Sequence, residues 1–282
     1  MKLKLVIPKG RIYEKVAQLL LESGVRLTGS ARNYRPSVND ESLEVKLLKS
    51  QNIPPLVSLG QHDIGFAGLD WVKEQNSEVE VLEDLGFDPV KIIAAIPDDW
   101  DWEAVKKRKI IAVSEYDNLC KAYLDDLGVN YTFVHSYGAT EVFPPEDADL
   151  VVDNTSTGST LIANRLKIID TIMTSSTCII ANPKALEDPN KKPIIENLLL
   201  LIRSVMQGRQ RVLLEMNCAE DRVDTIVSLL PAMHSPTVSK LYKSNGYSVK
   251  AAIKQEEVRE LIPKLITAGA ADILETPISK VV

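Results

Sequence analysis

Along the first two thirds of the chain, short apolar runs alternate with stretches whose apolar residues recur every three or four positions. The runs predict strands, and the stretches predict amphipathic helices. The clearest helical stripe consists of Ile12, Val16, Leu19 and Leu20, and Gly24 follows it as a helix stop. Strands are predicted at residues 4–7, 43–47, 63–68, 90–96, 109–113, 131–134, 150–152, 168–173 and 177–181. This alternation is typical of α/β layers with mainly parallel sheets.

The pattern changes after Gly208, which follows a long helix predicted at residues 193–206. Alternating Val212, Leu214 and Met216 predict a strand. The next elements are a helix at 219–230, strands at 237–242 and 247–253, a helix at 256–268 and a strand that begins at 272. The tripeptide Ser244-Asn245-Gly246 between the middle strands is a hairpin signal. The order βαββαβ is the ferredoxin-like plan, and the segment is long enough to form its own domain.

The most informative polar stretch follows the apolar run at residues 150–152 and precedes a helix that starts near residue 161. Its members are Asp153, Asn154, Thr155, Ser156, Thr157, Gly158, Ser159 and Thr160. A loop of this kind offers backbone N–H groups, hydroxyl donors and a positive dipole end to one anion. The acid at its start can accept hydrogen bonds from sugar hydroxyls. The stretch therefore suits a phosphorylated ribose.

This loop lacks the lysine and second glycine of a Walker A motif, and it is not a dinucleotide-binding fingerprint. The nearest pattern is the phosphoribosyl-diphosphate loop, in which two adjacent acids usually end the strand. Here Asn154 occupies the second position. An ordinary strand–turn–helix corner with Ser/Thr capping is the alternative interpretation.

Other candidates lie at further predicted strand ends, where open α/β sheets bind ligands. Gly10 lets the backbone approach a ligand, and Arg11 offers a two-pronged donor to phosphate. The remaining candidates in this group are Lys9, Arg32, Arg35, Lys49, Gly65, Gly68 and Glu141. Each has a plainer explanation as a solvated cation, a turn glycine or a helix-start acid.

Composition narrows the class of protein. The 282 residues are 45% hydrophobic and 26% charged, as in ordinary globular proteins, and the net charge of −6 argues against binding nucleic acid by global attraction. The first residues form no signal peptide, so we expect a cytoplasmic protein. No metal or catalytic-triad spacing links the cysteines and histidines. These are Cys120, Cys178, Cys218, His62, His135 and His234.

Several stretches together resemble one family, the long form of ATP phosphoribosyltransferase, the first enzyme of histidine biosynthesis. They fall in order along nearly the whole chain. The matching stretches are residues 8–11 (PKGR), 51–54 (QNIP), 63–71 (DIGFAGLDW), 138–142 (GATEV), 153–161 (DNTSTGSTL), 230–237 (LPAMHSPT) and 268–274 (AGAADIL). Each is weak alone, and jointly they are specific.

The resemblance implies a reaction in which N1 of the ATP adenine attacks C1 of phosphoribosyl diphosphate and pyrophosphate leaves. By similarity, residues 156–160 bind the 5-phosphate, while Asp153 and Glu141 bind ribose hydroxyls. Arg11 and Arg32 are expected near the phosphates of the two substrates. Mg²⁺ is expected mainly on the pyrophosphate, with no dedicated protein ligands assigned. Such a reaction depends on positioning and electrostatic support and needs no protein nucleophile.

The resemblance also implies two periplasmic-binding-protein-like α/β lobes with a cleft and a C-terminal ferredoxin-like βαββαβ regulatory domain. We expect the ATP-side lobe at residues 1–90 and 176–206, the phosphoribosyl-diphosphate lobe at 91–175 and the histidine-binding domain at 207–282. A homo-oligomer, dimeric and hexameric, is implied as well. The expected histidine pocket comprises Asn217, Met233, Ser235, Thr237 and Asp272.

Two positions depart from the family pattern. Lys49 stands where arginine is common, which gives a point charge instead of a planar fork. Asn217 stands where an acid sometimes contacts the inhibitor's amino group, so the strength of inhibition stays open. Two other classes compete with this prediction. One is a bilobal binding or sensor protein without turnover, and the other is a type I phosphoribosyltransferase acting on a free base, which usually shows the paired acids that Asn154 interrupts.

Overall fold

The computed structural model describes residues 2–29 and 33–282. Contacts within the chain divide it into two compact units. The first comprises Met1–Gln18 and Arg26–Ile195, and the second comprises Leu19–Val25 and Glu196–Val282. The expected division into two lobes and a third domain, with boundaries after residues 90, 175 and 206, is finer than this and stays a prediction.

The first unit is built on a sheet that, over the described residues, has the strand order β4-β1-β5-β10-β6-β9-β7-β8. Its strands are β1 (Leu3–Pro8), β4 (Leu43–Leu48), β5 (Ile64–Gly68), β6 (Glu80–Pro97), β7 (Ile110–Ser114), β8 (Tyr131–His135), β9 (Leu150–Thr155) and β10 (Leu166–Ala181). A small separate sheet pairs β2 (Leu27–Thr28) with β3 (Ser37–Val38).

Helices connect these strands, and most lie where the apolar spacing predicts them. The helices that begin in this part of the chain are α1 (Tyr13–Glu22), α2 (Ile53–Ser58), α3 (Leu69–Glu74), α4 (Trp102–Val105), α5 (Asp117–Asp126), α6 (Ser159–Ala163), α7 (Pro183–Glu187) and α8 (Lys192–Arg209). Short 3₁₀ turns are η1 (Ser50–Asn52) and η2 (Thr140–Val142). Gly24 adopts a positive φ of 95° just after α1, as a helix stop requires.

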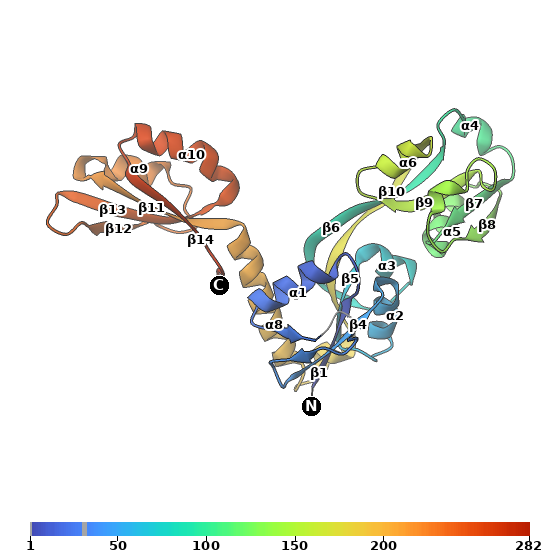
Figure 1. Cartoon of the computed structure of the whole chain (residues 1–282), viewed down its shortest axis with the longest axis horizontal. Helices are drawn as coiled ribbons and strands as arrows, with labels where there is room; N and C mark the ends of the chain where they lie inside the picture. Colours follow the sequence, from blue (N-terminus) through green and yellow to red (C-terminus); the bar gives the residue numbers. More distant parts are fainter. Residues whose placement is uncertain (1, 30–32) are drawn as a thin grey trace. The chain divides into compact units, whose positions relative to one another are not determined.

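Two long antiparallel strands, β6 and β10, connect two groups of parallel strands (Figure 1). One group is β4-β1-β5 and the other is β9-β7-β8, so the two-lobed α/β fold expected from the sequence is confirmed. The sheet is less uniformly parallel than predicted, because β10 runs antiparallel to β5 and β6, and β6 runs antiparallel to β9.

The prediction of separate strands at 168–173 and 177–181 is wrong, because both belong to β10. The polar residues between them suggested a break. Instead Ser175 and Thr177 are buried, and the Ser175 hydroxyl donates to Asp70 Oδ1 at 2.6 Å. The first half of β6 was also missed, since its acidic residues do not form an apolar run.

Both faces of the central strands are covered, which explains the continuous apolar run in β6. Ile92 and Ile96 pack in a cluster with Leu124 of α5. Ile93 packs in a different cluster with Leu161 of α6. Burial on both faces is typical of sheets with helices on either side. This packing fixes β9, which runs to Thr155 and so contains the first residues of the polar loop.

The second unit contains the predicted βαββαβ order. Its elements are β11 (Arg211–Ala219), η3 (Glu220–Arg222), α9 (Val223–Leu229), β12 (Thr237–Lys240), β13 (Gly246–Lys254), α10 (Gln255–Thr267) and β14 (Ala271–Pro277). The antiparallel strand order β12-β13-β11-β14 is that of a ferredoxin-like sheet, which confirms the prediction. The first helix is shorter than predicted, because its opening turn is the 3₁₀ segment η3.

Candidate functional site

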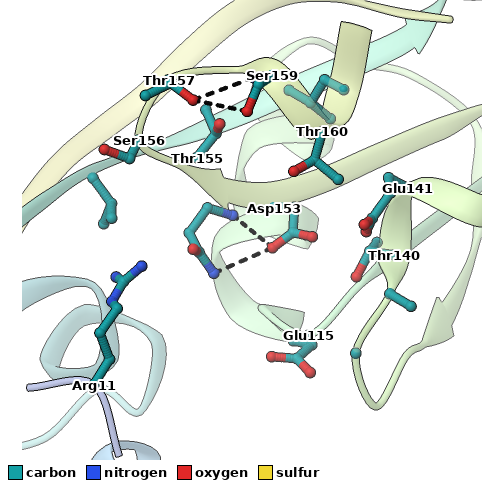
Figure 2. A pocket seen from close by; sticks show the side chains of 15 residues that line it. Arg11, Glu115, Thr140, Glu141, Asp153, Thr155, Ser156, Thr157, Ser159 and Thr160 are labelled. Atoms are coloured by element: carbon teal, nitrogen blue, oxygen red, sulfur yellow. Dashed lines mark hydrogen bonds between the residues drawn. The ribbon is translucent and has the colours of Figure 1, made fainter. Parts of the chain in front are cut away.

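A cavity of about 390 Å³ lies in the first unit beside the polar loop that follows β9 (Figure 2). It brings together residues from five separate stretches of the sequence. Predicted site residues that line it are Arg11, Glu141, Asp153, Ser156, Thr157, Ser159 and Thr160. Thr140, from the matching stretch at residues 138–142, lines it as well, and so does Glu115, which the sequence did not single out.

The polar loop folds onto itself through its own side chains. Gly158 takes the left-handed conformation, with φ 76° and ψ 1°, directly before α6. Its N–H donates to Thr155 Oγ1 at 2.9 Å, and the hydroxyls of Thr157 and Ser159 lie 3.0 Å apart. Glycine adopts this backbone conformation without steric cost. Helix α6 has only five residues, so hydroxyls and backbone N–H groups, more than a long helix dipole, would stabilise a bound anion.

Asp153 is held in an unusual electrostatic environment. Burial raises the pKa of its carboxyl to about 6, and the negative charges of Glu115 and Glu141 act in the same direction. The Asn154 backbone N–H opposes this by donating to Asp153 Oδ1 at 2.6 Å, and the Thr140 hydroxyl also lowers the pKa. Hydroxyl donors from a ligand would likewise favour the charged carboxylate. Asp153 is therefore an acceptor that gains its charge most readily when a hydroxyl-bearing ligand is present.

A second cavity of about 160 Å³ is lined by Arg11 and Asn154, which also line the first. Within it, the buried Tyr116 hydroxyl donates to Asp70 Oδ2 at 2.8 Å. The Trp71 and Tyr116 rings stack with centroids 4.7 Å apart. Burial and the nearby Asp70 carboxylate raise the pKa of Tyr116, so the phenol stays a hydrogen-bond donor. An aromatic stack beside polar groups suits a planar, polar ring.

The other predicted glycines and cations are spread more widely. Gly68 lines the second cavity, and an added Cβ there would lie 2.1 Å from Asp70 Oδ1. Lys9 and Gly10 line a third cavity of about 190 Å³, where Lys9 Nζ lies 3.7 Å from the Tyr34 ring centroid.

Two further predicted residues, Gly65 and Lys49, do not line these cavities as the described residues define them. Gly65 is fully buried, and an added Cβ would lie 2.6 Å from Ile53 Cγ2, so close packing explains this glycine. Lys49 is exposed and precedes η1, next to Ser50 of the second cavity. Arg32 lies outside the described residues.

In the second unit, Asn217 and Asp272 are brought together. Asn217 Nδ2 donates to Asp272 Oδ2 at 3.0 Å, and Asp272 has a positive φ of 51°. Asn217 also lines an open cavity of about 390 Å³ with Leu241 and Gly246. The other three predicted inhibitor-binding residues are exposed, and among the described residues they do not line this cavity. These are Met233, Ser235 and Thr237.

Neither a metal cluster nor a membrane span emerges from residues 2–29 and 33–282. No group of three or more His, Cys, Asp or Glu side chains there is placed to hold a metal ion. No helix in the same residues is long and apolar enough to cross a membrane.

The fold and the cavities define a class: two-lobed α/β proteins with a hydroxyl-rich loop suited to a phosphorylated ligand and a ferredoxin-like domain in the same chain. Comparison with protein families is more specific. The ATP phosphoribosyltransferase family model matches residues 49–204, and the model for the HisG C-terminal domain matches residues 208–280. The chain belongs to the ATP phosphoribosyltransferase family, in its long form.

Individual relatives agree with this assignment. The ATP phosphoribosyltransferase of Pelotomaculum thermopropionicum is 41% identical, with 100% of both chains covered. The ATP phosphoribosyltransferase of Desulforudis audaxviator is 40% identical, again with 100% of both chains covered. Among solved structures, an ATP phosphoribosyl transferase (HisG:HisZ) complex from Thermotoga maritima matches with a TM-score of 0.64 and 26% identity, covering 71% of this chain and 98% of that chain.

The enzyme class predicted from the sequence is thereby confirmed. Members of this family are pentosyltransferases that bind ATP and phosphoribosyl diphosphate, use a metal ion and catalyse the first step of histidine biosynthesis. The two competing classes, a non-catalytic sensor and a type I phosphoribosyltransferase, have no support in these comparisons.

Proposed function

We propose that the first cavity binds phosphoribosyl diphosphate. Its 5-phosphate would lie on the loop of residues 156–160, and its ribose hydroxyls would donate to Asp153 and Glu141. The observation that carries this proposal is the lining of one cavity by a hydroxyl-rich loop, three carboxylates and Arg11. Phosphate needs donors, ribose needs acceptors, and a diphosphate needs a cation.

ATP would use the adjoining cavity, with its adenine against Trp71, whose ring stacks on the buried Tyr116 ring. Arg11 lines both cavities, so the diphosphate leaving group and the nucleotide would meet near its guanidinium. In the reaction, the bond from C1 to the pyrophosphate oxygen breaks while the bond from adenine N1 to C1 forms. The chain contributes alignment of the two substrates and electrostatic stabilisation of the charge that develops at C1.

The metal ion is proposed to be Mg²⁺. Carboxylate oxygens suit this ion, and three carboxylate groups, those of Glu115, Glu141 and Asp153, line the cavity. Because these groups do not form a closed ligand set within the described residues, the ion would be held by one or two of them together with substrate phosphates. Bound there, Mg²⁺ would neutralise charge on the departing pyrophosphate.

The ferredoxin-like domain is proposed to bind histidine as a feedback inhibitor, in a homo-oligomer that is dimeric or hexameric. Asn217 and Asp272 would contact the inhibitor's polar groups. Asn217 stands where other family members sometimes have an acid. The Asp272 carboxylate, whose Oδ2 lies 3.0 Å from Asn217 Nδ2, supplies an acid next to this position. An amino group could therefore still find a negative partner.

The phosphate-binding role of the loop can be tested with Thr160→Val, which keeps the side-chain shape and removes one hydroxyl. We expect calorimetry to show about tenfold weaker binding of phosphoribosyl diphosphate with Mg²⁺, since hydrogen bonds to charged groups stabilise by about 1.5–3 kcal/mol. The matched control is Thr132→Val on exposed β8, which should bind as the wild type does. Equal affinity of all three proteins would remove the Thr160 hydroxyl from the site.

A further inference from the structure

An irregular segment of β6 lies beside the cavities. Phe87 pairs with Thr177 and Asp84 with Cys178, so the two residues between Asp84 and Phe87 are extra relative to β10. Gly86 and Asp88 have positive φ angles of 63° and 45°. Asp84 Oδ1 accepts from the Gly86 N–H at 2.9 Å and also from the Ser176 hydroxyl, which fixes the bulge. Bulges of this kind redirect a side chain, and strained residues gather at functional sites.

The redirected side chain is that of Asp88, which is only 12% exposed. Its Oδ1 accepts from Lys15 Nζ at 2.6 Å, and its Oδ2 lies 3.4 Å from Arg11 Nε. Oδ2 is buried and has no hydrogen bond within the described part of the chain. Lys15 thus pairs closely with the carboxylate, whereas Arg11 is held by charge alone and can still align.

The contact between Asp88 and Arg11 leaves the two Nη groups of Arg11 open. The Arg11 side chain is 69% exposed, and Figure 2 shows it reaching toward the cavity. Because the guanidinium is planar, a carboxylate at Nε sets the direction of the Nη fork. Lys15 neutralises the negative charge of Asp88. Asp88 can therefore orient Arg11 while the guanidinium still presents a net positive charge to a ligand.

We propose that Asp88 is a positioning residue that holds Arg11 at Nε, so that the Nη fork faces the diphosphate of phosphoribosyl diphosphate. This inference rests on the proposed function, since it requires that Arg11 contact that substrate. Arg11 is the binding group and Asp88 acts through it. When the fork binds phosphate, the Nε–H turns toward Asp88 Oδ2 and gives this buried oxygen its missing donor.

The test is a double-mutant cycle on the full-length enzyme, measured by initial rates with each substrate varied. Asp88→Asn keeps the shape and tolerates a positive φ, so it should fold normally. We expect it to raise the KM for phosphoribosyl diphosphate by about three- to tenfold and the KM for ATP by a smaller factor, because Asp88 and Arg11 also line the second cavity. Should Asp88→Asn melt early, Asp88→Gly, which also tolerates this backbone conformation, is expected to give the same change.

The second arm is Arg11→Lys, which keeps the charge and removes Nε. It should raise the same KM, and adding Asp88→Asn to it should then change the KM by less than about twofold. If Arg11→Lys leaves the KM unaltered, the proposed role of Arg11 in the site is wrong. If Arg11→Lys acts but Asp88→Asn does not, or if Asp88→Asn acts equally in both backgrounds, the positioning role is wrong while the site stands.

Discussion

Replacing Asp153 by asparagine should stabilise the ligand-free first unit while impairing catalysis. The side chains have the same shape, and asparagine keeps the Oδ1 acceptor that lies 2.6 Å from the Asn154 nitrogen. What disappears is a charge that burial and two neighbouring carboxylates oppose. Such a trade between stability and activity is typical of functional sites.

The magnitude follows from the pKa. Burial raises the pKa of Asp153 from 3.8 to about 6, a difference worth about 3 kcal/mol in the free energy of unfolding. A raised folded-state pKa means that the folded chain binds more protons than the unfolded chain between these values, so stability falls as pH rises across this window. Below it both states are protonated. The advantage of Asp153→Asn should therefore grow by as much as about 3 kcal/mol between about pH 3 and pH 7.

Urea unfolding followed by tryptophan fluorescence can measure this difference. All three tryptophans, Trp71, Trp100 and Trp102, lie in the first unit, so the signal reports on that unit alone. The unfolding free energies of wild type and variant are compared across the pH window. A difference that stays constant with pH would refute the reasoning, because it would mean that Asp153 is not held in an unfavourable charged state.

Two further predictions concern the packing and the regulatory domain. Gly65→Ala would place a Cβ 2.6 Å from Ile53 Cγ2, so it should lower the free energy of unfolding by about 1–3 kcal/mol in the same urea assay. Unchanged stability together with weaker substrate binding would instead show that Gly65 acts in the binding site. Thr237→Ala removes an exposed hydroxyl at the start of β12. It should raise the histidine concentration for half-inhibition about fivefold with little loss of activity. An inhibition curve identical to that of the wild type would mean that histidine binds elsewhere.

Local features of the sequence predicted the loop well. The order of strand end, acid, hydroxyl-rich turn and glycine is contained in one short stretch, and Gly158 has the left-handed conformation that such a turn requires. The ferredoxin-like domain was also predictable, because its strands and helices follow simple apolar periods and a hairpin signal joins β12 to β13.

Pairs formed across long stretches of chain were not predictable in this way. Tyr116 and Asp70 meet only in the folded first unit, and no local pattern marks either as a partner. The contact between Asp88 and Arg11 likewise depends on a bulge that periodicity does not reveal. Gly65 shows a different limit: a glycine at a strand end suggested a ligand site, and the close packing of α2 side chains around it appears only in the fold, so its role in binding stays a prediction.

The most direct test of the account is turnover by the purified full-length protein and by Asp153→Asn. The assay follows the absorbance of phosphoribosyl-ATP in a mixture of ATP, phosphoribosyl diphosphate, Mg²⁺ and pyrophosphatase. We expect product from the wild type only when both substrates are present. For the variant, kcat/KM for phosphoribosyl diphosphate should fall about tenfold or more, because a charge-assisted acceptor is lost. Failure of the wild type to form product, or an unchanged kcat/KM in the variant, would contradict the proposed site.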